Sequence, residues 1–170
     1  MDATKKIAVV QGAGPVVQEL FRTLAERWRD EARVVGAIAE DHDLPDRACT
    51  AGYLRSLADG ARYPIFQDLG RGSQTCHLAG DGALVAASAV AKDIETGCDL
   101  VILSKFGKLE AAGGGLREAF AAAMETGVPV LTSVALSQVA PWESFAAPLF
   151  TPIPADVSEI GAWWERVRKG

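Results

Sequence analysis

The sequence predicts a three-layer α/β fold whose mainly parallel sheet has about five strands and a β-hairpin extension. Short, continuous apolar runs such as Leu100–Leu103 are typical of strands buried on both faces, as the strands of parallel sheets are. Between these runs lie segments with apolar residues at three- and four-residue steps, which indicates helices. Because the two patterns alternate, we expect helices on both faces of one sheet, in a single domain that spans residues 1–170.

The apolar runs place the strands and the periodic segments place the helices. Strands are expected at Lys6–Gln11, Val34–Ala39, Leu100–Leu103, Pro129–Val134 and Leu149–Ile153. Helices are expected from the residues after Pro15 to about Asp30, and at Gly82–Thr96, Leu116–Thr126, Gln138–Phe145 and Asp156–Arg168. The first two strands and the helix between them form a short β-α-β unit, which predicts a parallel pair with a right-handed crossover.

The hairpin extension is predicted from its turn. Two short segments, Tyr53–Leu57 and Ala61–Phe66, flank the dipeptide Asp59-Gly60, which is a strong hairpin signal. Pro64 has no backbone N–H to donate, so the second arm is expected at an edge of the sheet.

Two helices carry specific predictions about their faces. The residues of the Gly82–Thr96 helix that are expected to face the core are Leu84, Val90, Ala91 and Ile94. In the last helix, Asp156 is expected to cap the N-terminus, and a stripe from Val157 to Val167 is expected to pack on the core. Trp163 lies off that stripe, which makes it a candidate contact for a partner.

Charge and composition exclude several classes of function. The formal net charge of -5 argues against general binding to nucleic acid or to anionic membranes. No apolar run approaches the length of a membrane span, and no signal-peptide segment precedes the first strand, so a cytoplasmic location is expected. The three cysteines, Cys49, Cys76 and Cys98, lack the paired spacing of a zinc site or a disulfide framework.

Most residues suited to binding lie in the stretch Asp99–Arg117, around the end of the central buried strand. In open α/β sheets, ligands bind beyond the carboxyl ends of the strands. There the glycine N–H groups and the N-terminus of the next helix would cradle an oxyanion, and an anion would relieve the unfavourable effect of the helix dipole on Arg117. Glu110 is expected to support the site as a partner of one of the lysines, with a role as a base the alternative. The residues predicted to bind an anion or a nucleotide here are Lys105, Lys108, Gly113, Gly114, Gly115 and Arg117.

Two phosphate-binding motifs are incomplete at the first strand-to-helix turn. Gly12 and Gly14 match the beginning of the dinucleotide motif G-x-G-x-x-G, but Val17 replaces its third glycine; Glu40 would take the ribose hydroxyl. In the P-loop motif, G-x-x-x-x-G-K-[ST], Val17 and Gln18 stand where the phosphate-binding lysine and the magnesium-binding hydroxyl belong. Gly12 and Gly14 are candidate contacts for an anion or a nucleotide, and the alternative is a plain tight turn.

A family resemblance covers most of the chain and is densest from Asp99 to Val134. The segments AGYLRSLADGARYPIF, DLVILSKFGKLE and PVLTSV resemble the small thermophilic-type nucleoside triphosphatases of the P-loop class. The segments KFGKLEAAGGGLREA and VPVLTSV are closer to an uncharacterised bacterial domain family, a degenerate relative of those enzymes. Members of that family tend to be encoded near molybdate-uptake and nitrogenase genes. The resemblance implies a P-loop-like fold and a link to molybdenum metabolism.

The departures from the enzyme family change the expected chemistry. Where the resemblance places an acidic pair at the end of the central strand, this chain has Ser104 and Lys105. Without the phosphate lysine, the magnesium hydroxyl and the acids, phosphoryl transfer loses its main electrostatic supports. We therefore expect no catalytic residues, no metal and no hydrolysis of nucleoside triphosphates. Lys105 is instead expected to neutralise an anion directly.

Cys76 and His77 form a further candidate pair, in a glycine-rich segment before a helix. A thiol beside an imidazole is a possible nucleophile or ligand pair. Adjacent side chains seldom point at each other, so the pair is retained only as a support for the site.

The leading functional prediction is the binding of a small anionic molecule, either a nucleotide phosphate or a tetrahedral oxyanion such as molybdate. Apart from such a nucleotide or oxyanion, the sequence identifies no cofactor. One alternative is a Rossmann-like NAD(P)-binding module that uses Gly12, Gly14 and Glu40. Another is an accessory protein with a vestigial pocket that holds a protein partner or forms a homodimer through Trp163 or the hairpin edge.

Overall fold

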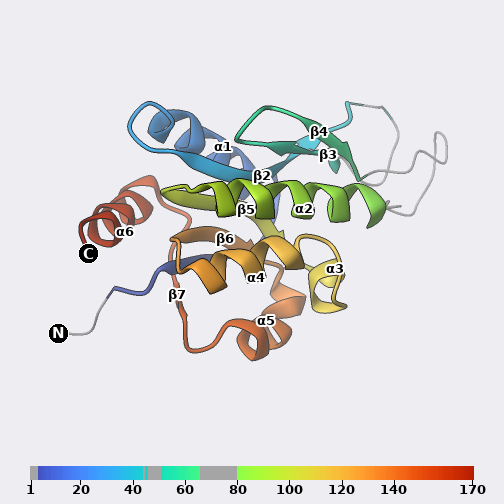
Figure 1. Ribbon diagram of the computed structural model, residues 1–170. Helices are drawn as coiled ribbons and strands as arrows, with labels where there is room; N and C mark the ends of the chain where they lie inside the picture. The colour runs from blue at the N-terminus through green and yellow to red at the C-terminus, as the bar shows by residue number, and fades with distance from the viewer. Residues whose placement is uncertain (1–3, 44, 46–50, 66–79) are drawn as a thin grey trace.

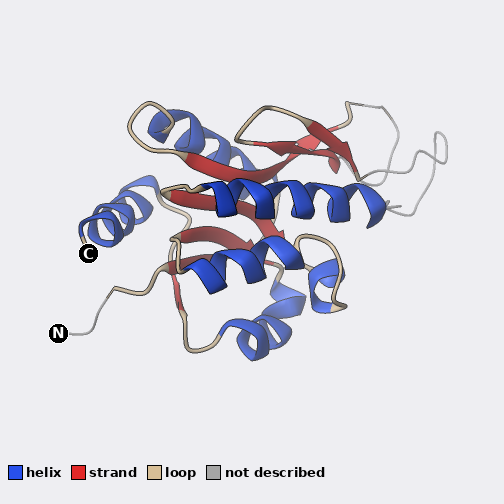
Figure 2. Ribbon diagram, viewed as in Figure 1, coloured by secondary structure: helices blue, strands red, loops and turns tan. Residues whose placement is uncertain are grey.

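A mixed sheet with the strand order β4-β3-β2-β5-β6-β1-β7 forms the middle layer of the structure (Figure 2). The computed structural model describes residues 4–43, 45, 51–65 and 80–170. The strands are β1 (Ile7–Gln11), β2 (Val34–Asp41), β3 (Ala51–Ser56), β4 (Arg62–Pro64), β5 (Leu100–Phe106), β6 (Val130–Val134) and β7 (Phe150–Pro152). The five strands β2, β5, β6, β1 and β7 run parallel, and the β3–β4 hairpin is added antiparallel to β2. The predicted fold class is confirmed.

The pairing of the first two strands differs from the prediction. β1 and β2 run in the same direction, but β5 and β6 lie between them. β1 pairs instead with β6, where Ile7 is opposite Val130, and β2 pairs with β5, where Val34 is opposite Leu100. The spacing of a β-α-β unit fixes the direction of its strands, but strands that come later in the chain can insert between them. The predicted parallel direction of the two strands is therefore confirmed, but they do not pair with each other.

Helices cover both faces of the sheet, so the structure has three layers (Figure 1). The helices α1 (Pro15–Trp28) and α6 (Val157–Lys169) pack on one face, through apolar residues such as Phe21 and Trp164. The helices α2 (Gly80–Thr96), α4 (Arg117–Thr126) and α5 (Val139–Ala146) pack on the other, through residues such as Val90, Phe120 and Trp142. The short helix α3 (Lys108–Ala111) and a 3-10 turn, η1 (Leu136–Gln138), follow the ends of β5 and β6. Among the described residues, no helix is both long enough and apolar enough to cross a membrane.

The residues that α2 buries near its start have smaller side chains than predicted. Val90, Ala91 and Ile94 are buried as expected, but Leu84 is 49% exposed, so its predicted inward position was wrong. The residues of α2 that pack on the sheet near its start are alanines, Ala83, Ala86 and Ala87. Small side chains allow the helix to approach the hairpin closely: a Cβ on Gly82 would stand 1.6 Å from the carbonyl oxygen of Pro64.

The last helix buries both of its tryptophans. Asp156 caps α6 as predicted, since its carboxylate accepts a hydrogen bond from the Glu159 N–H at 2.9 Å. Trp163, however, is fully buried, and its Nε1 donates to the carbonyl oxygen of Lys5 at 2.9 Å. The prediction that Trp163 is a surface contact for a partner was therefore wrong, because the chain segment before β1 covers the side of α6 outside the main stripe.

The hairpin forms where its turn signal lies. Gly60 adopts a positive φ of 78°, and its N–H donates to the carbonyl oxygen of Ser56 at 2.9 Å. The Asp59 carboxylate accepts the N–H of Ala61 at 2.9 Å and so closes the turn. Pro64 lies in β4 at the edge of the sheet, as predicted.

Candidate functional site

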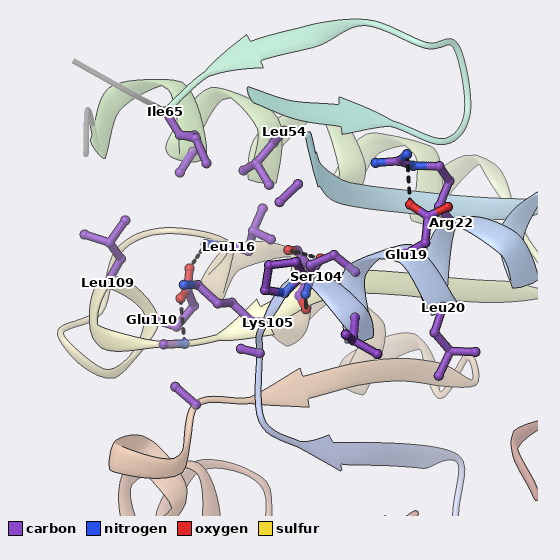
Figure 3. A pocket seen from close by; sticks show the side chains of 18 of the residues that line it. Glu19, Leu20, Arg22, Leu54, Ile65, Ser104, Lys105, Leu109, Glu110 and Leu116 are labelled. Carbon is purple, nitrogen blue, oxygen red and sulfur yellow. Dashed lines mark hydrogen bonds and ion pairs between the residues drawn. The ribbon is translucent and has the colours of Figure 1, made fainter. Parts of the chain in front are cut away.

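A cavity of about 1040 Å³ lies beyond the carboxyl ends of the parallel strands (Figure 3). Its wall includes a residue at or just after the end of each of four strands: Ala13 after β1, Asp41 of β2, Gly107 after β5 and Ala135 after β6. The helix that follows β1 packs on one face of the sheet and the helix that follows α3 packs on the other. Diverging helices open a crevice at this edge, which is where open α/β sheets bind ligands.

Lys105 and Lys108 both lie on the cavity wall. Lys105 is the exposed residue near the end of β5, and Lys108 begins α3. Neither ammonium group forms an ion pair with any residue that the structure describes. Both ammonium groups are therefore available to contact a ligand that enters the cavity.

Gln18 and Ser104 hydrogen-bond to each other across the floor of the cavity. The Gln18 Nε2 donates to the carbonyl oxygen of Ser104 at 3.0 Å, and the Ser104 Oγ donates to the Gln18 Oε1 at 2.7 Å. Ser133 on β6 also donates to the same carbonyl oxygen at 2.7 Å. These bonds fasten α1 to the end of β5 and engage both oxygens of Ser104.

Glu110 is a buried carboxylate that binds backbone amides. Only 5% of the residue is exposed. Its Oε1 accepts the N–H of Gly107 at 2.9 Å, and its Oε2 accepts the N–H of Leu116 at 2.8 Å. The predicted ion pair with Lys105 or Lys108 is not formed. In Figure 3 the side chain of Lys105 runs toward Glu110, yet the carboxylate is held by the amides before α3 and α4.

The amides of the glycine turn bond to the backbone of α3, where the sequence predicts that they bind an external anion. The N–H of Gly113 donates to the carbonyl oxygen of Glu110 at 3.1 Å, and that of Gly114 to the carbonyl oxygen of Leu109 at 2.8 Å. Gly115 is held against Glu110 so closely that a Cβ would stand 1.8 Å from its Oε2. None of the three glycines lines the cavity. Two of the glycine N–H groups are therefore bonded to carbonyl oxygens of α3, and the third glycine packs against the Glu110 carboxylate.

Arg117 does not reach the cavity either. Its guanidinium carbon lies 4.7 Å from the centre of the Phe145 ring, a cation–π contact with α5. Its Nη1 also donates to the carbonyl oxygen of Glu110 at 3.0 Å. These two contacts explain how the helix tolerates a cation in its first turn, without a bound anion.

Gly12 and Gly14 shape the turn into α1, but only Ala13 between them lines the cavity. Gly12 has a φ of +99°, and its N–H donates to the carbonyl oxygen of Val134 at 2.9 Å. The carbonyl oxygen of Gly14 accepts the N–H groups of Val17 and Gln18 at the beginning of the helix. Only residues 12–14 connect β1 to α1. A P-loop needs four residues between its glycines, so this turn is too short to enclose a phosphate in that manner.

Two other groups of residues predicted from the sequence are not part of the cavity: one lies away from it, and the other lies outside the described residues. Glu40 forms ion pairs with Arg55 and with Arg62 at 2.8 Å, which fastens β2 to the hairpin and occupies the group that the Rossmann alternative assigns to a ribose. Cys76 and His77 lie outside the described residues. Within the described part of the chain, no three His, Cys, Asp or Glu side chains converge as a metal site would require.

Sequence reasoning missed the apolar wall and the other charged residues of the cavity. Glu19 and Arg22 of α1 line it as an ion pair of 3.1 Å, and Asp41 lines it from the end of β2. The position of Asp41 follows from the same edge rule that selected Lys105. The apolar wall combines residues from the hairpin, α2 and the α3 region that are far apart in sequence, so no local signal reveals it. These apolar residues are Leu54, Ile65, Ala83, Leu109 and Leu116.

The structure has a P-loop-like α/β fold, with a three-residue turn between β1 and α1. A solved structure, the crystal structure of THEP1 from the hyperthermophile Aquifex aeolicus, superposes with a TM-score of 0.60 and covers 95% of both chains. Its sequence is 13% identical, so this likeness shows the fold alone. The predicted resemblance to the thermophilic-type P-loop class is confirmed at that level.

The family model described as "Protein of unknown function (DUF2478)" matches residues 7–163, and the chain belongs to this family. A relative named molybdenum import ATP-binding protein ModC 2, from Bradyrhizobium diazoefficiens, is 36% identical over 150 residues. The match covers 86% of this chain and 17% of the relative, so the chain spans about a sixth of that protein's length.

Proposed function

We propose that this protein binds a small anionic molecule in the cavity, with Lys105 and Lys108 as the groups that neutralise its charge. The observation that carries the proposal is the pair of ammonium groups on the cavity wall, neither of which has an ionic partner among the described residues. Hydrogen bonds between a cation and an anionic ligand are about twice as strong as neutral ones, so two lysines give useful affinity.

The ligand classes are a nucleotide phosphate and a tetrahedral oxyanion. The P-loop-like fold supports the first, since its crevice lies at the edge where that fold class holds phosphates. The relative's name supports the second, because it concerns molybdenum import. The match covers 17% of that relative, so its name is a reason to test molybdate as a ligand.

The protein is proposed to bind without hydrolysing nucleoside triphosphates. Val17, at the place of the phosphate lysine, is buried in the core, and Gln18 is hydrogen-bonded to Ser104. Transition-state stabilisation by a lysine and a metal is therefore missing at this turn. Incubation with magnesium and ATP or GTP is expected to release no phosphate above background. Release that disappears in the Gln18→Ala variant would contradict the proposal, whereas release unchanged by that substitution would point to a contaminant.

The alternatives are less well supported by the geometry. The strand order differs from the 3-2-1-4-5-6 order of dinucleotide-binding sheets, and Glu40 is paired with two arginines. The accessory-protein alternative loses its predicted contact, because Trp163 is buried.

Thermal unfolding tests the proposal. The parent protein is melted with phosphate, sulfate, molybdate, tungstate, mononucleotides, nucleoside triphosphates and NAD(P). A ligand at a hundred times its dissociation constant raises the free energy of unfolding by about 2.7 kcal/mol, a readable shift. The shift is expected to shrink in Lys105→Ala and Lys108→Ala. It should persist in Lys92→Ala, a matched control because Lys92 is an exposed lysine of α2 outside the cavity. No shift with any anion, or equal shifts in all variants, would refute the proposal.

A further inference from the structure

The P-loop class implies a nucleotide bound with magnesium, so the residues at that position must be tested for their fit to a cation. Gln18 and Ser104 stand where the hydroxyl and the acid of that class would hold the metal. Their side chains instead bind each other, at 3.0 and 2.7 Å. The nearby carboxylate of Glu110 is engaged by two backbone amides. A magnesium ion needs oxygen ligands in octahedral geometry, but the Gln18 oxygen and both Glu110 carboxylate oxygens already accept hydrogen bonds. The residues do not fit the metal.

The charge of the cavity wall then limits the charge of the ligand. The wall carries three basic side chains and three acidic ones, so its formal charges cancel. The six residues are Arg22, Lys105, Lys108, Glu19, Asp41 and Glu110. Arg22 pairs with Glu19, and the Glu110 carboxylate is bound by two backbone amides. The two lysines are therefore the basic groups of the wall without an ionic partner among the described residues, and Asp41 is the remaining acid. A single phosphate group carries about -1.5 to -2 at neutral pH, which two ammonium groups can balance. The polyphosphate of a nucleoside triphosphate, without its metal, would leave unbalanced charge in a partly enclosed site.

The size and surface of the cavity indicate how large and how apolar the rest of the ligand is. A volume of about 1040 Å³ is far larger than a tetrahedral oxyanion fills, and it is at the upper end of pockets that hold small organic molecules. Leu54, Ile65, Leu109 and Leu116 lie at the Glu110 end of the view in Figure 3, and Glu19 and Arg22 lie at the other end. Lys105 therefore extends from β5 beside an apolar surface that suits a planar ring or another apolar group.

We infer that the cavity takes a metal-free organic anion of about mononucleotide size. One phosphate group lies at Lys105 and Lys108, and an apolar or aromatic ring packs on Leu54, Ile65, Leu109 and Leu116. This inference rests on the proposed function and narrows it, because it excludes the magnesium complex of a nucleoside triphosphate and a bare oxyanion as the preferred ligand. The closed Gln18–Ser104 pair makes binding independent of divalent cations.

Titration calorimetry on the full chain tests this inference. The probes are AMP, GMP, the matching triphosphates, inorganic phosphate and molybdate, each with EDTA and with magnesium. A monophosphate is expected to bind with affinities that agree within about twofold in the two buffers. The triphosphate is expected to bind no more tightly, even with magnesium, and inorganic phosphate more weakly. Lys105→Ala should weaken the monophosphate about tenfold or more.

A second variant separates the ring from the phosphate. Leu109→Ala removes part of the apolar wall while keeping the Cβ that packs near Gly115. It is expected to weaken the monophosphate and to leave inorganic phosphate unchanged, because only the former has a ring. Equal effects on both probes would contradict the proposed position of the ring.

The outcomes distinguish this inference from the function on which it rests. Binding that depends on Lys105 but requires magnesium, or that favours the triphosphate or molybdate, would overturn the inference and leave the proposed function in place. An absence of binding by all probes, or binding unaffected by Lys105→Ala, would overturn both.

Discussion

Gln18 of α1 and Ser104 of β5 form a reciprocal pair of hydrogen bonds, 3.0 and 2.7 Å long, at the carboxyl end of the central strand. The two residues are 86 positions apart in the chain. Their bonds join the first helix directly to the central strand.

This pair predicts a measurable coupling between the two side chains. Ser104 is 3% exposed, so its removal leaves the Gln18 Oε1 without its donor. Ser104→Ala is expected to lower the free energy of unfolding by about 1 kcal/mol, and a double-mutant cycle with Gln18→Ala should give a coupling energy of similar size. Urea unfolding measures both. Ser137→Ala, at an exposed serine on the same edge, serves as the control. Additive single effects would show that the pair contributes nothing beyond its members.

Glu110 is predicted to stabilise the fold through its carboxylate rather than to act as a base. Glu110→Ala removes the acceptor of two amide N–H groups, those of Gly107 and Leu116. The expected loss is about 3 kcal/mol, because charge-assisted hydrogen bonds are strong and the amides are buried. Glu110→Gln keeps one oxygen acceptor and should lose about half as much. Chemical denaturation compares these variants with Glu125→Ala, an exposed acid of α4. A loss no greater than that of the control would contradict the capping role.

Gly115 and Gly114 are predicted to differ sharply in their tolerance of a methyl group. Gly115 has a φ of +55°, and a Cβ there would stand 1.8 Å from the Glu110 Oε2. Gly115→Ala is therefore expected to cost at least about 2 kcal/mol of stability. A Cβ on Gly114 would meet only the carbonyl oxygen of Leu109 at 3.6 Å, an ordinary contact. Gly114→Ala should leave the melting temperature unchanged or slightly raised, and similar losses at both positions would disprove this packing.

Asp93 is predicted to make stability depend on pH. Burial raises the pKa of its carboxyl above the ordinary value of 3.8, Asp59 raises it further, and Arg33 opposes the change. Because the folded state prefers the protonated form, this carboxyl weakens folding as pH rises through its two pKa values. Asp93→Asn should raise the melting temperature at neutral pH, and the gain should vanish in acid below the ordinary value. Glu26→Gln, at an exposed acid of α1, is the control. A gain in melting temperature that persists in acid would show that the ionisation of Asp93 is not its cause.

The fold could be predicted because each of its layers leaves a local signal. The run Leu100–Leu103 marks a strand that is fully buried, and Gly127 adopts the left-handed conformation expected at the end of α4. The strand order could not be predicted in the same way. Whether β5 and β6 insert between β1 and β2 depends on the packing of the whole sheet.

The candidate site was predicted in position but not in detail. The rule that ligands bind at carboxyl ends of strands selected Lys105 and Lys108, and both line the cavity. The roles of Glu110 and Arg117 were missed because each contacts a group that the sequence does not place beside it: the amide of Leu116 for Glu110, and the ring of Phe145 for Arg117. The bond of Glu110 to the N–H of Gly107 is the capping-box contact of an N3 glutamate at α3, which is a recognised sequence signal. Its bond to the N–H of Leu116, six residues further on, has no such signal, so only the structure reveals it.

Diffraction from crystals grown with a nucleoside monophosphate in EDTA tests the central claim most directly. The account predicts electron density for the phosphate within about 3 Å of the Lys105 and Lys108 Nζ atoms, with no metal and with the Gln18–Ser104 bonds intact. It also predicts the base against Leu109 and Leu116. Density elsewhere on the protein, or an empty cavity with both ammonium groups in water at saturating ligand, would contradict it.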